Sequence, residues 1–237
     1  MTSLGYACFQ LHNALVRTGA SRTITHNTVR DFHYMMAHNY QPHQYWEYLS
    51  NGSFKEVYSA AAAPFVLKFV SQYNETDEER SLLEVAAQEG VAQFFVPTTF
   101  IDLPHTLEAY YLEGVEAYDE EYEEEEEYVP HPLVTLQVQP RVVVNTDGGY
   151  IREADRPLIH LHDKNGQPLE EWTQRSLLYY FSSRVWLEDL AAYYTNKEIC
   201  RLVDFLEAYE VCDLHNYNLG YYHGAPVIFD CFSRSLT

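Results

Sequence analysis

Three polar side chains near the end of the printed sequence have the types and the spacing that phosphoryl transfer needs. Asp213 and Asn218 stand five residues apart in C-D-L-H-N-Y-N-L-G, and Asp230 follows in V-I-F-D-C-F. Two short aromatic and β-branched runs, 219–222 and 227–229, lie between them and are separated by Gly and Pro, which predicts a β-hairpin. A hairpin would return the chain and bring the second acid back towards the first acid and the amide.

The chemistry of these three side chains depends on what they bind. In a phosphotransferase, one Asp orients the attacking hydroxyl, while an Asn and a second Asp hold magnesium on a nucleoside triphosphate. The plain alternative is an Asp that caps a turn and an Asp that ends a strand, because D-x-x-x-x-N by itself is a weak motif. Both interpretations stay open at this point, and residues further upstream bear on the choice.

A lysine inside an apolar strand is the first of these upstream residues. Lys68 lies in P-F-V-L-K-F-V, where strand alternation turns it away from the side taken by its two apolar neighbours. A helix predicted over 75–87 follows. Glu79 shares the side of its apolar residues and is the best anionic partner for Lys68, with Glu84 as the alternative. The competing interpretations are a lysine that reaches the surface and a solvated acidic helix face.

A glycine turn precedes the lysine strand. In L-S-N-G-S-F-K-E-V-Y (49–58), Gly52 separates two predicted strands. Because glycine has no side chain, backbone amides in such a turn can approach phosphate groups closely. A turn of this kind beside a strand that carries a lysine fits the binding of a nucleotide.

Composition and charge limit the kind of protein. With 237 residues, of which 46% are hydrophobic, the chain can bury a core for one domain or two small lobes. A net charge of −20 disfavours direct binding to nucleic acid and favours partner proteins with basic surfaces, although plain solubility would also explain it. The four cysteines show no C-x-x-C pair and no zinc spacing. Without a signal peptide or an apolar run of membrane-spanning length, we expect a soluble, cytoplasmic protein that does not bind membranes.

A run of like charges, E-A-Y-D-E-E-Y-E-E-E-E-E-Y at 116–128, interrupts the predicted strands. Self-repulsion makes this acidic block a loop or a fraying helix, most simply a solvated insertion. A docking strip for a basic protein and a mimic of nucleic-acid phosphates are the less favoured alternatives. Calcium binding comes last, because the block lacks the glycine and the oxygen spacing of a calcium loop.

The order of the predicted elements favours an α+β fold with two lobes. Helices within 1–45 form an N-terminal extension, and a β-rich lobe over 46–139 includes a strand predicted at 94–103. Residues 137–141, which contain a proline, form the joint between the lobes. A small helical lobe over 140–237 then carries the Asp-Asn loop and the hairpin.

With these elements in order, the sequence resembles the protein kinase fold. More closely, it resembles the early-expressed serine/threonine protein kinases of short-tailed lytic bacteriophages. The likeness is carried by the glycine turn, the V-L-K-F strand, the helix that runs into C-D-L-H-N-Y-N-L-G, and the I-F-D-C-F segment. It spans about 46–232 but is specific only in these blocks.

The resemblance implies ATP and Mg²⁺ as cofactors and a role for each candidate residue. Lys68 would hold the α- and β-phosphates and would be tied by Glu79. Asp213 would accept the proton of the substrate hydroxyl, while Asn218 and Asp230 would bind Mg²⁺. The glycine turn would cover the ATP phosphates through Ser50, Asn51, Gly52, Ser53, Phe54 and Val57.

The sequence departs from the family pattern where substrate binding and regulation are concerned. Of the usual glycines in the turn only Gly52 is present, and Val211 and Cys212 replace the His-Arg that precedes the catalytic Asp. No arginine there can read a phosphorylated activation loop. Only seven residues follow Asp230, so the activation segment and the later helices that bind peptides in conventional kinases are not in the sequence. Peptide recognition would then come from the N-terminal helices or the acidic block.

The sequence is therefore compatible with three functions. The first is an ATP- and Mg²⁺-dependent serine/threonine protein kinase, encoded by a phage, that phosphorylates host proteins to shut off or redirect host processes. The second is a kinase-like binding protein, a pseudokinase or an acidic nucleic-acid mimic, that inhibits a host protein by docking. The third is a small-molecule phosphotransferase, because D-L-H-x-x-N also occurs in kinases such as those that modify aminoglycosides.

Overall fold

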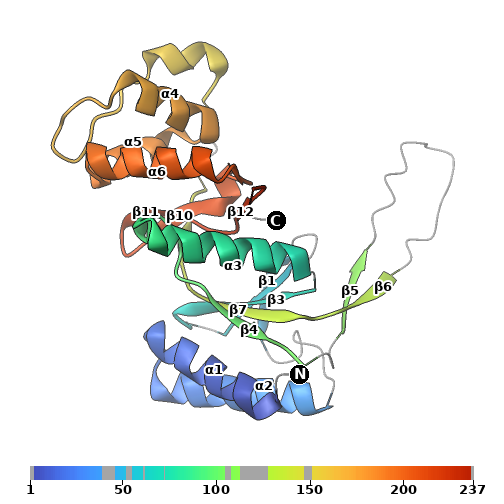
Figure 1. Cartoon of the computed structure of the whole chain (residues 1–237). Helices are drawn as coiled ribbons and strands as arrows, with labels where there is room; N and C mark the ends of the chain where they lie inside the picture. Colours follow the sequence, from blue (N-terminus) through green and yellow to red (C-terminus); the bar gives the residue numbers. More distant parts are fainter. Residues whose placement is uncertain are drawn as a thin grey trace, which may run out of the picture. The chain divides into compact units, whose positions relative to one another are not determined.

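The computed structural model describes residues 3–38, 46–51, 55–60, 62–71, 73–104, 108–112, 128–146 and 151–235. It consists of helices and antiparallel sheets, so the predicted α+β class is confirmed at that level. The chain divides into two compact units (Figure 1). The first is Met1–Thr76 with Thr98–Pro140, and the second is Asp77–Pro97 with Arg141–Thr237.

A five-stranded antiparallel sheet forms the centre of the first unit. Its order is β1 (Glu47–Asn51), β2 (Lys55–Ser59), β3 (Phe65–Val70), β7 (Thr135–Pro140) and β4 (Thr99–Asp102). Two further strands, β5 (Glu108–Leu112) and β6 (Tyr128–Pro132), pair with each other. The middle strand β3 is rich in β-branched and aromatic residues, which favour a pleated and buried surface. Pro140 is the last residue of β7, as expected for a residue without an amide hydrogen.

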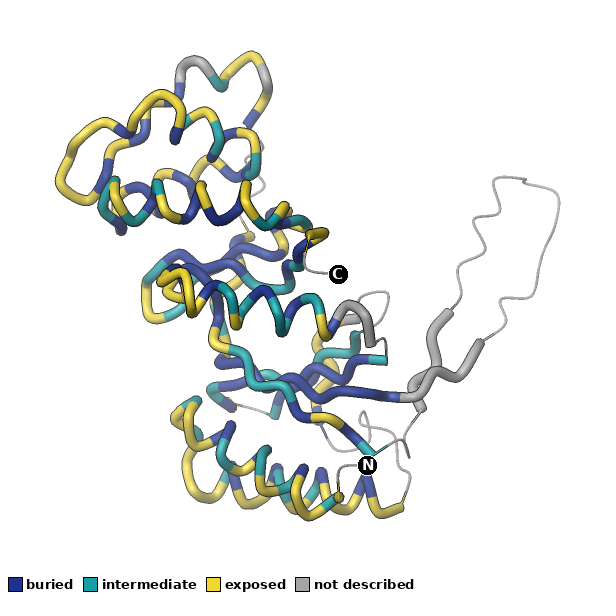
Figure 2. Tube along the Cα trace, in the orientation of Figure 1, coloured by how far each residue is buried: buried dark blue, intermediate teal, exposed yellow. Residues whose placement is uncertain are grey.

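Two helices, α1 (Leu4–Arg17) and α2 (Arg22–His38), cover one face of this sheet. The hydroxyl of Ser3 accepts a hydrogen bond from the amide of Tyr6 and so caps α1. Each helix buries one side and exposes the other, as the colours in Figure 2 show. The buried side chains of both helices join those of the sheet in one hydrophobic core. The N-terminal segment is therefore a layer of the first unit.

Helices are the main regular elements of the second unit. They are most of α3 (Tyr73–Gln88), then α4 (Glu171–Tyr180), α5 (Arg184–Tyr193) and α6 (Asn196–Ala208), with the 3₁₀ helices η2 (Ala92–Phe94), η3 (Glu153–Leu158) and η4 (Asn216–Asn218). A small antiparallel sheet has the order β11 (Ala225–Ile228), β10 (Leu219–Tyr222) and β8 (Val143–Val144). A short pair joins β12 (Phe232–Ser233) to β9 (Val211–Cys212).

Helix α6 leads directly into the candidate loop, and its apolar side anchors it in the core of the second unit. A capping box starts the helix: the Thr195 hydroxyl accepts from the amide of Glu198, and the Glu198 carboxylate accepts from the amide of Thr195. The hydrogen bonds from Thr195 lower the pKa of Glu198. Five side chains of one helical side are buried, namely Ile199, Leu202, Val203, Phe205 and Leu206.

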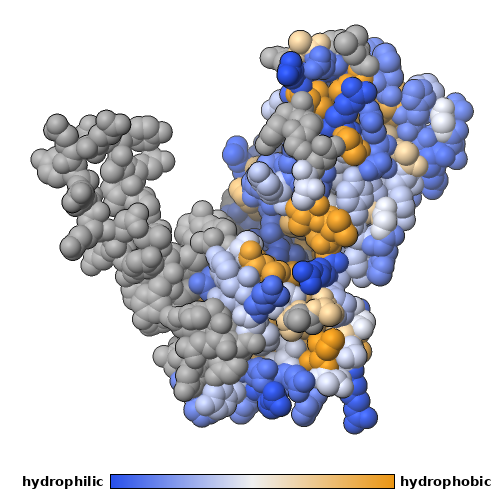
Figure 3. All heavy atoms as spheres, turned by 180° about the vertical axis from the view of Figure 1, so that it is seen from behind, coloured by the Kyte–Doolittle hydropathy of each residue, from blue (hydrophilic) through white to orange (hydrophobic). Residues whose placement is uncertain are grey.

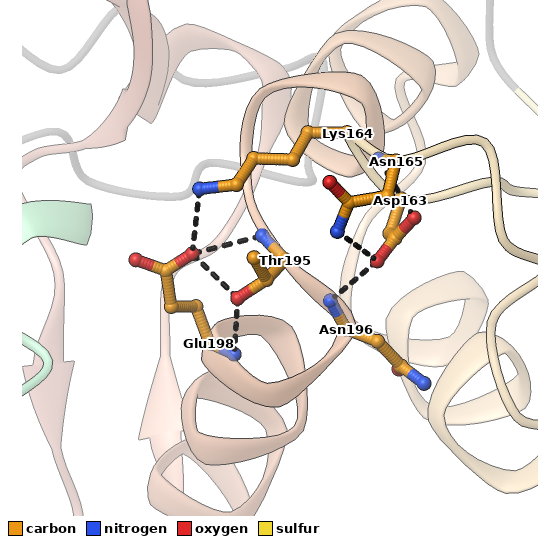
Figure 4. A network of polar contacts seen from close by, with 6 residues as sticks. All are labelled: Asp163, Lys164, Asn165, Thr195, Asn196 and Glu198. Atoms are coloured by element: carbon orange, nitrogen blue, oxygen red, sulfur yellow. Dashed lines mark hydrogen bonds and ion pairs between the residues drawn. The ribbon is translucent and has the colours of Figure 1, made fainter.

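A polar network joins the start of α6 to the loop at 163–167, which precedes α4 (Figure 4). The buried carboxylate of Asp163 accepts from the amides of Asn165 and Gln167 at 2.9 Å, and from the amide of Asn196 at 3.1 Å. These hydrogen bonds, the one from Gln167 above all, lower the pKa of Asp163. Since they favour the charged carboxylate, they link the folded loop to the ionised form of Asp163.

Acid should weaken this network. A carboxyl group whose pKa is lowered by folding stabilises the fold above its unfolded pKa of about 3.9, and that stabilisation is lost as the pH falls through the folded value. We therefore expect Asp163→Asn to reduce the loss of stability as the pH falls below about 4, measured in urea titrations. The exposed Asp204 on α6 gives a matched control, Asp204→Asn, which should keep the wild-type pH profile. Equal profiles for both variants would contradict the prediction.

The apolar run at 94–103 is not one strand, so that prediction is wrong. Phe94 ends η2, and only Thr99–Asp102 form β4. Phe94 and Phe95 are both buried in the core of the second unit, whereas a half-buried strand would alternate. The boundary between the two units falls within this run, between Pro97 and Thr98. Residues 77–97, which the sequence groups with the β-rich lobe, belong to the second unit.

The exposed surface is mixed in character. On the face seen in Figure 3, apolar atoms form separate patches among polar ones. Exposed large apolar side chains are scattered over several elements, among them Phe9 on α1, Val143 on β8 and Tyr179 on α4. No helix in the described ranges combines the length and the apolar character needed to cross a membrane.

Candidate functional site

The side chain of Asn218 connects the two candidate acids within the second unit. Its amide nitrogen lies 2.9 Å from the carbonyl oxygen of Asp213, 3.0 Å from Oδ2 of Asp213 and 3.0 Å from the carbonyl oxygen of Asp230. The sequence separates these residues by five and by twelve positions, and the fold brings them to one point. Asn218 is 7% exposed, whereas the side chain of Asp213 is 41% exposed and can be reached from solvent.

The predicted hairpin is confirmed and explains this meeting. Strands β10 and β11 pair in antiparallel register from Leu219 and Ile228 to Tyr222 and Ala225. His223 and Gly224 both have positive φ, of 52° and 82°, which is the backbone of a type I′ hairpin turn. At the open end, the amide of Phe229 donates to the carbonyl of Asn218 at 2.9 Å. The chain thus returns to Asn218 immediately before Asp230.

Both candidate acids have left-handed backbone. Asp213 has φ of 62° and Asp230 has φ of 54°. Asp tolerates this region better than most residues, but a non-glycine residue there costs free energy and is maintained by its surroundings. At this site, the pairing of β9 with β12 and the Asn218 hydrogen bonds maintain it. Residues of this backbone type are concentrated at functional sites, which favours a functional interpretation of the loop.

A buried polar layer supports the hairpin and was not predicted from the sequence. The Trp186 indole donates to the carbonyl of Gly220 at 3.1 Å, and Ser182 donates to Oδ1 of Asn216 at 3.0 Å. The Tyr194 hydroxyl lies 3.1 Å from the carbonyl of Gln93 and 3.3 Å from that of Pro226, and burial raises its pKa to about 12. These contacts join residues far apart in the chain, so no local pattern could have indicated them.

Gly220 is required by close packing. A Cβ atom at this position would lie 2.6 Å from the carbonyl oxygen of Val143, nearer than real contacts allow. The absence of a side chain therefore permits β8 to pair with β10 directly behind the candidate loop.

His215 was also absent from the predicted site. Its Nε2 lies 3.1 Å from Oδ1 of Asp213, so both carboxylate oxygens of Asp213 have a partner, the other being Asn218. The neighbouring Tyr217 is 73% exposed, and its ring meets the His215 ring edge-on. The sequence does contain one signal for this contact: His215 follows Asp213 by two residues. Two polar side chains this near to each other in a loop can come into contact.

In the first unit, three candidate nucleotide-binding residues lie in one row across the sheet. Ser50 of β1 is opposite Val57 of β2, and Val57 is opposite Lys68 of β3. Partners in an antiparallel register point to the same face. This face is opposite to the one covered by α1 and α2, since Leu67 and Phe69 lie in the helix-covered core. The predicted orientation of Lys68 is thereby confirmed.

Burial decides between the alternatives for the two charged residues. Lys68 is 3% exposed, which does not fit a lysine that reaches the surface. Glu79 on α3 is also 3% exposed, whereas Glu84 is exposed, so Glu79 is the better candidate for an internal partner. Lys68 belongs to the first unit and Glu79 to the second. Their pairing stays a prediction.

The side chains at the hairpin are of types that Mg²⁺ accepts as ligands. The Asn218 amide nitrogen faces three acceptors, so its Oδ1 points away from them and is left for another partner. Amide and carboxylate oxygens are ligands that Mg²⁺ accepts, and it commonly takes only one or two carboxylates beside phosphate oxygens. Among the described residues, no three His, Cys, Asp or Glu side chains gather closely enough to form a metal cage. A cage of that kind is not what Mg²⁺ on a nucleotide requires.

Some predicted residues lie outside the part of the chain that the structure describes. They are Gly52, Ser53 and Phe54 of the glycine turn and 116–127 of the acidic block. Asn51 is described only as the last residue of β1, and Tyr128 only as the first residue of β6.

Comparison of the chain with protein-family models, with curated proteins and with solved structures found no match. The assignment of residues to a site therefore depends on the geometry of the hairpin and the sheet.

Proposed function

We propose that this chain is an ATP- and Mg²⁺-dependent serine/threonine protein kinase with a kinase-like bilobal fold. Its substrates would be host proteins with basic surfaces in the host cytoplasm, the kind of partner that a net charge of −20 favours. The observation that carries the proposal is the Asn218 amide, which ties Asp213 to Asp230 through three hydrogen bonds. An acid, an amide and a second acid held together are the protein groups that phosphoryl transfer uses.

Asp213 acts as the base in this proposal. Its carboxylate is half exposed and is held by Asn218 and His215, so it is positioned without being sealed from a substrate hydroxyl. It accepts the hydroxyl proton while the hydroxyl oxygen attacks the γ-phosphorus and the bond to the bridging oxygen of ADP breaks. The hydrogen bond from Asn218 to one carboxylate oxygen and the His215 contact to the other also restrict its rotation, which lowers the entropy that must be lost before reaction.

Asn218 and Asp230 hold the metal in this proposal. When bound, Mg²⁺ supplies positive charge that stabilises the phosphate oxygens. The protein's part is to fix the ligands beforehand, and the left-handed backbone at Asp230 and the pinned amide of Asn218 support this role. In the first unit, the row of Ser50, Val57 and Lys68 supports a phosphate-binding face, with Glu79 as the proposed partner of the buried lysine.

Replacing Asp213 by alanine tests the proposed base. We expect the rate of phosphate transfer from γ-labelled ATP to a basic protein mixture to fall by about a hundredfold to ten-thousandfold, the usual contribution of general-base catalysis. Asp230→Ala should lower the rate as well, and it should also remove the dependence of the rate on Mg²⁺. Asp204→Ala, at an exposed position on α6, is the control and should keep the wild-type rate. Equal labelling by wild type and Asp213→Ala would exclude the mechanism.

A second candidate function is favoured by the net charge of −20. The chain would be a kinase-like binding protein that docks on a basic host protein through its acidic block at 116–128. Deleting 116–128 should weaken partner binding at least tenfold at low salt and leave ATP turnover intact, as measured by co-purification and labelling. If binding and turnover are both unchanged, the block is a solvated loop with no part in docking.

A further inference from the structure

A pocket on the second unit lies apart from the hairpin site. It encloses about 630 Å³ and is lined by Arg156, His160, Leu161, Pro168, Leu169, Glu171, Gln174, Arg175, Leu178 and Tyr179. This volume is within the range of small-molecule sites. Helix α4 packs on α6, and Figure 1 shows α4 on the side of α6 away from the β10–β11 hairpin. The pocket is therefore not part of the proposed kinase site.

The floor of this pocket is apolar and its rim is polar. Leu161, Leu169 and Leu178 are each less than a tenth exposed, whereas Tyr179 is 75% exposed. The residues that α4 contributes recur at helical spacing, so a single helical side forms one wall. A ligand that fits such a pocket has an apolar body for the floor and a polar group for the rim.

The charged side chains in the lining favour a negatively charged ligand. Arg175 is paired with Glu171 at 2.8 Å, so these two charges largely cancel. Arg156 has no ion pair or side-chain hydrogen bond with any described residue, and its Nε is buried without a partner. A buried donor without an acceptor is costly, and the terminal N–H groups of the same guanidinium can hold a carboxylate or phosphate through two parallel hydrogen bonds. A positive pocket is also unusual in a chain of net charge −20.

The walls of the pocket are fixed before any ligand binds. Gln174 of α4 accepts from the amide of Leu161 at 2.9 Å and donates to the carbonyl of Ile159 at 2.8 Å. The amide of Leu169 donates to the carbonyl of Leu161 at 3.0 Å. Three separate segments are thus held in register, so a ligand would not have to order them.

We propose that this pocket binds a small amphipathic organic anion, with an aromatic or aliphatic body on the leucine floor and a carboxylate or phosphate on Arg156. An arginine without an ion-pair partner among the described residues and three buried leucines in the same lining together define this class. The site is separate from nucleotide binding at the hairpin, and it is expected in the protein whether or not the kinase proposal holds.

Calorimetric titration of the whole chain with 2-naphthyl phosphate and 2-naphthoate tests the proposal. Both should bind saturably, and Arg156→Gln should weaken the binding by about tenfold or more, since it removes a charge-assisted bidentate contact. Arg156→Lys, which keeps the charge but lacks the planar fork, should weaken it by a smaller factor and serves if the Gln variant does not fold. Arg152→Gln, at an exposed arginine outside the lining, should bind within about twofold of wild type.

Three further titrations test the same proposal. Asp213→Ala should bind both probes as wild type does, because the hairpin is not involved. Inorganic phosphate and neutral 2-naphthol should each bind about tenfold or more weakly than 2-naphthyl phosphate, because each lacks one half of the recognised chemistry. The proposal is overturned if neither anion saturates, if Arg156→Gln and Arg152→Gln bind equally, or if phosphate or naphthol alone binds as well as the combined ligand. Loss of binding in Asp213→Ala would assign the probes to the hairpin site and overturn it too.

Discussion

Replacing Asn218 by alanine is expected to lower the rate of phosphate transfer by at least about a thousandfold and the free energy of unfolding by about 2–4 kcal/mol. The amide donates to three acceptors, and two of them are backbone carbonyls of Asp213 and Asp230. Asn218 is 7% exposed, so water would not replace the lost donor without rearrangement. The same change frees two residues with left-handed backbone, and we expect both acids to lose their positions.

Asn218→Asp separates the two roles of this side chain. Aspartate keeps the size and an oxygen ligand but has no amide hydrogen, and it would place a second negative charge about 3 Å from Oδ2 of Asp213. If the hydrogen bonds are what matters, the Asp variant will be as unstable as the Ala variant in urea titrations and equally inactive. A stable and active Asp variant would show that only the metal-ligand oxygen is needed, and would contradict the positioning role.

A remote asparagine provides the matched control. Asn27 is exposed on α2 of the first unit, and Asn27→Ala should leave both the stability and the rate close to wild type. Wild-type stability in Asn218→Ala would show that the three hydrogen bonds are not needed to hold the loop.

The local parts of the candidate site could be predicted from the sequence because the chain itself closes them. A Gly-containing turn between two short β-branched runs predicts a hairpin, and a hairpin returns Asp230 to Asn218 whatever the rest of the chain does. The direction of Lys68, away from the side of Leu67 and Phe69, follows in the same way from strand alternation. Both inferences need only a few consecutive residues.

The remaining parts depend on contacts between distant segments. Trp186 and Gly220, or Ser182 and Asn216, are more than thirty residues apart and carry no shared pattern. The run at 94–103 predicts one strand from sequence alone, because apolar residues in series suit a buried strand and a buried turn equally well. What distinguishes the two is the packing of Phe94 and Phe95 into the core of the second unit, which a short window of sequence does not contain.

The second large effect is expected for Trp186→Ala, which should lower the free energy of unfolding by about 3–5 kcal/mol. Trp186 is fully buried and packs against Phe181 with ring centroids 4.9 Å apart. Its removal would leave a cavity and would also take the indole donor from the carbonyl of Gly220. Trp172 of α4, which is 47% exposed, is the matched control, and Trp172→Ala should change the stability by no more than about 0.5 kcal/mol.

Trp186→Phe leaves a smaller cavity than Trp186→Ala, because it keeps an aromatic ring while removing the indole donor. We expect a loss of about 1–3 kcal/mol from the unsatisfied carbonyl of Gly220, measured by urea unfolding. Gly220 is two residues after Asn218, so this variant also reports whether the position of β10 controls the rate. If β10 positions the loop, transfer will slow at temperatures where the protein remains folded. A destabilised variant with the wild-type rate would mean that Asn218 alone holds the two acids in place.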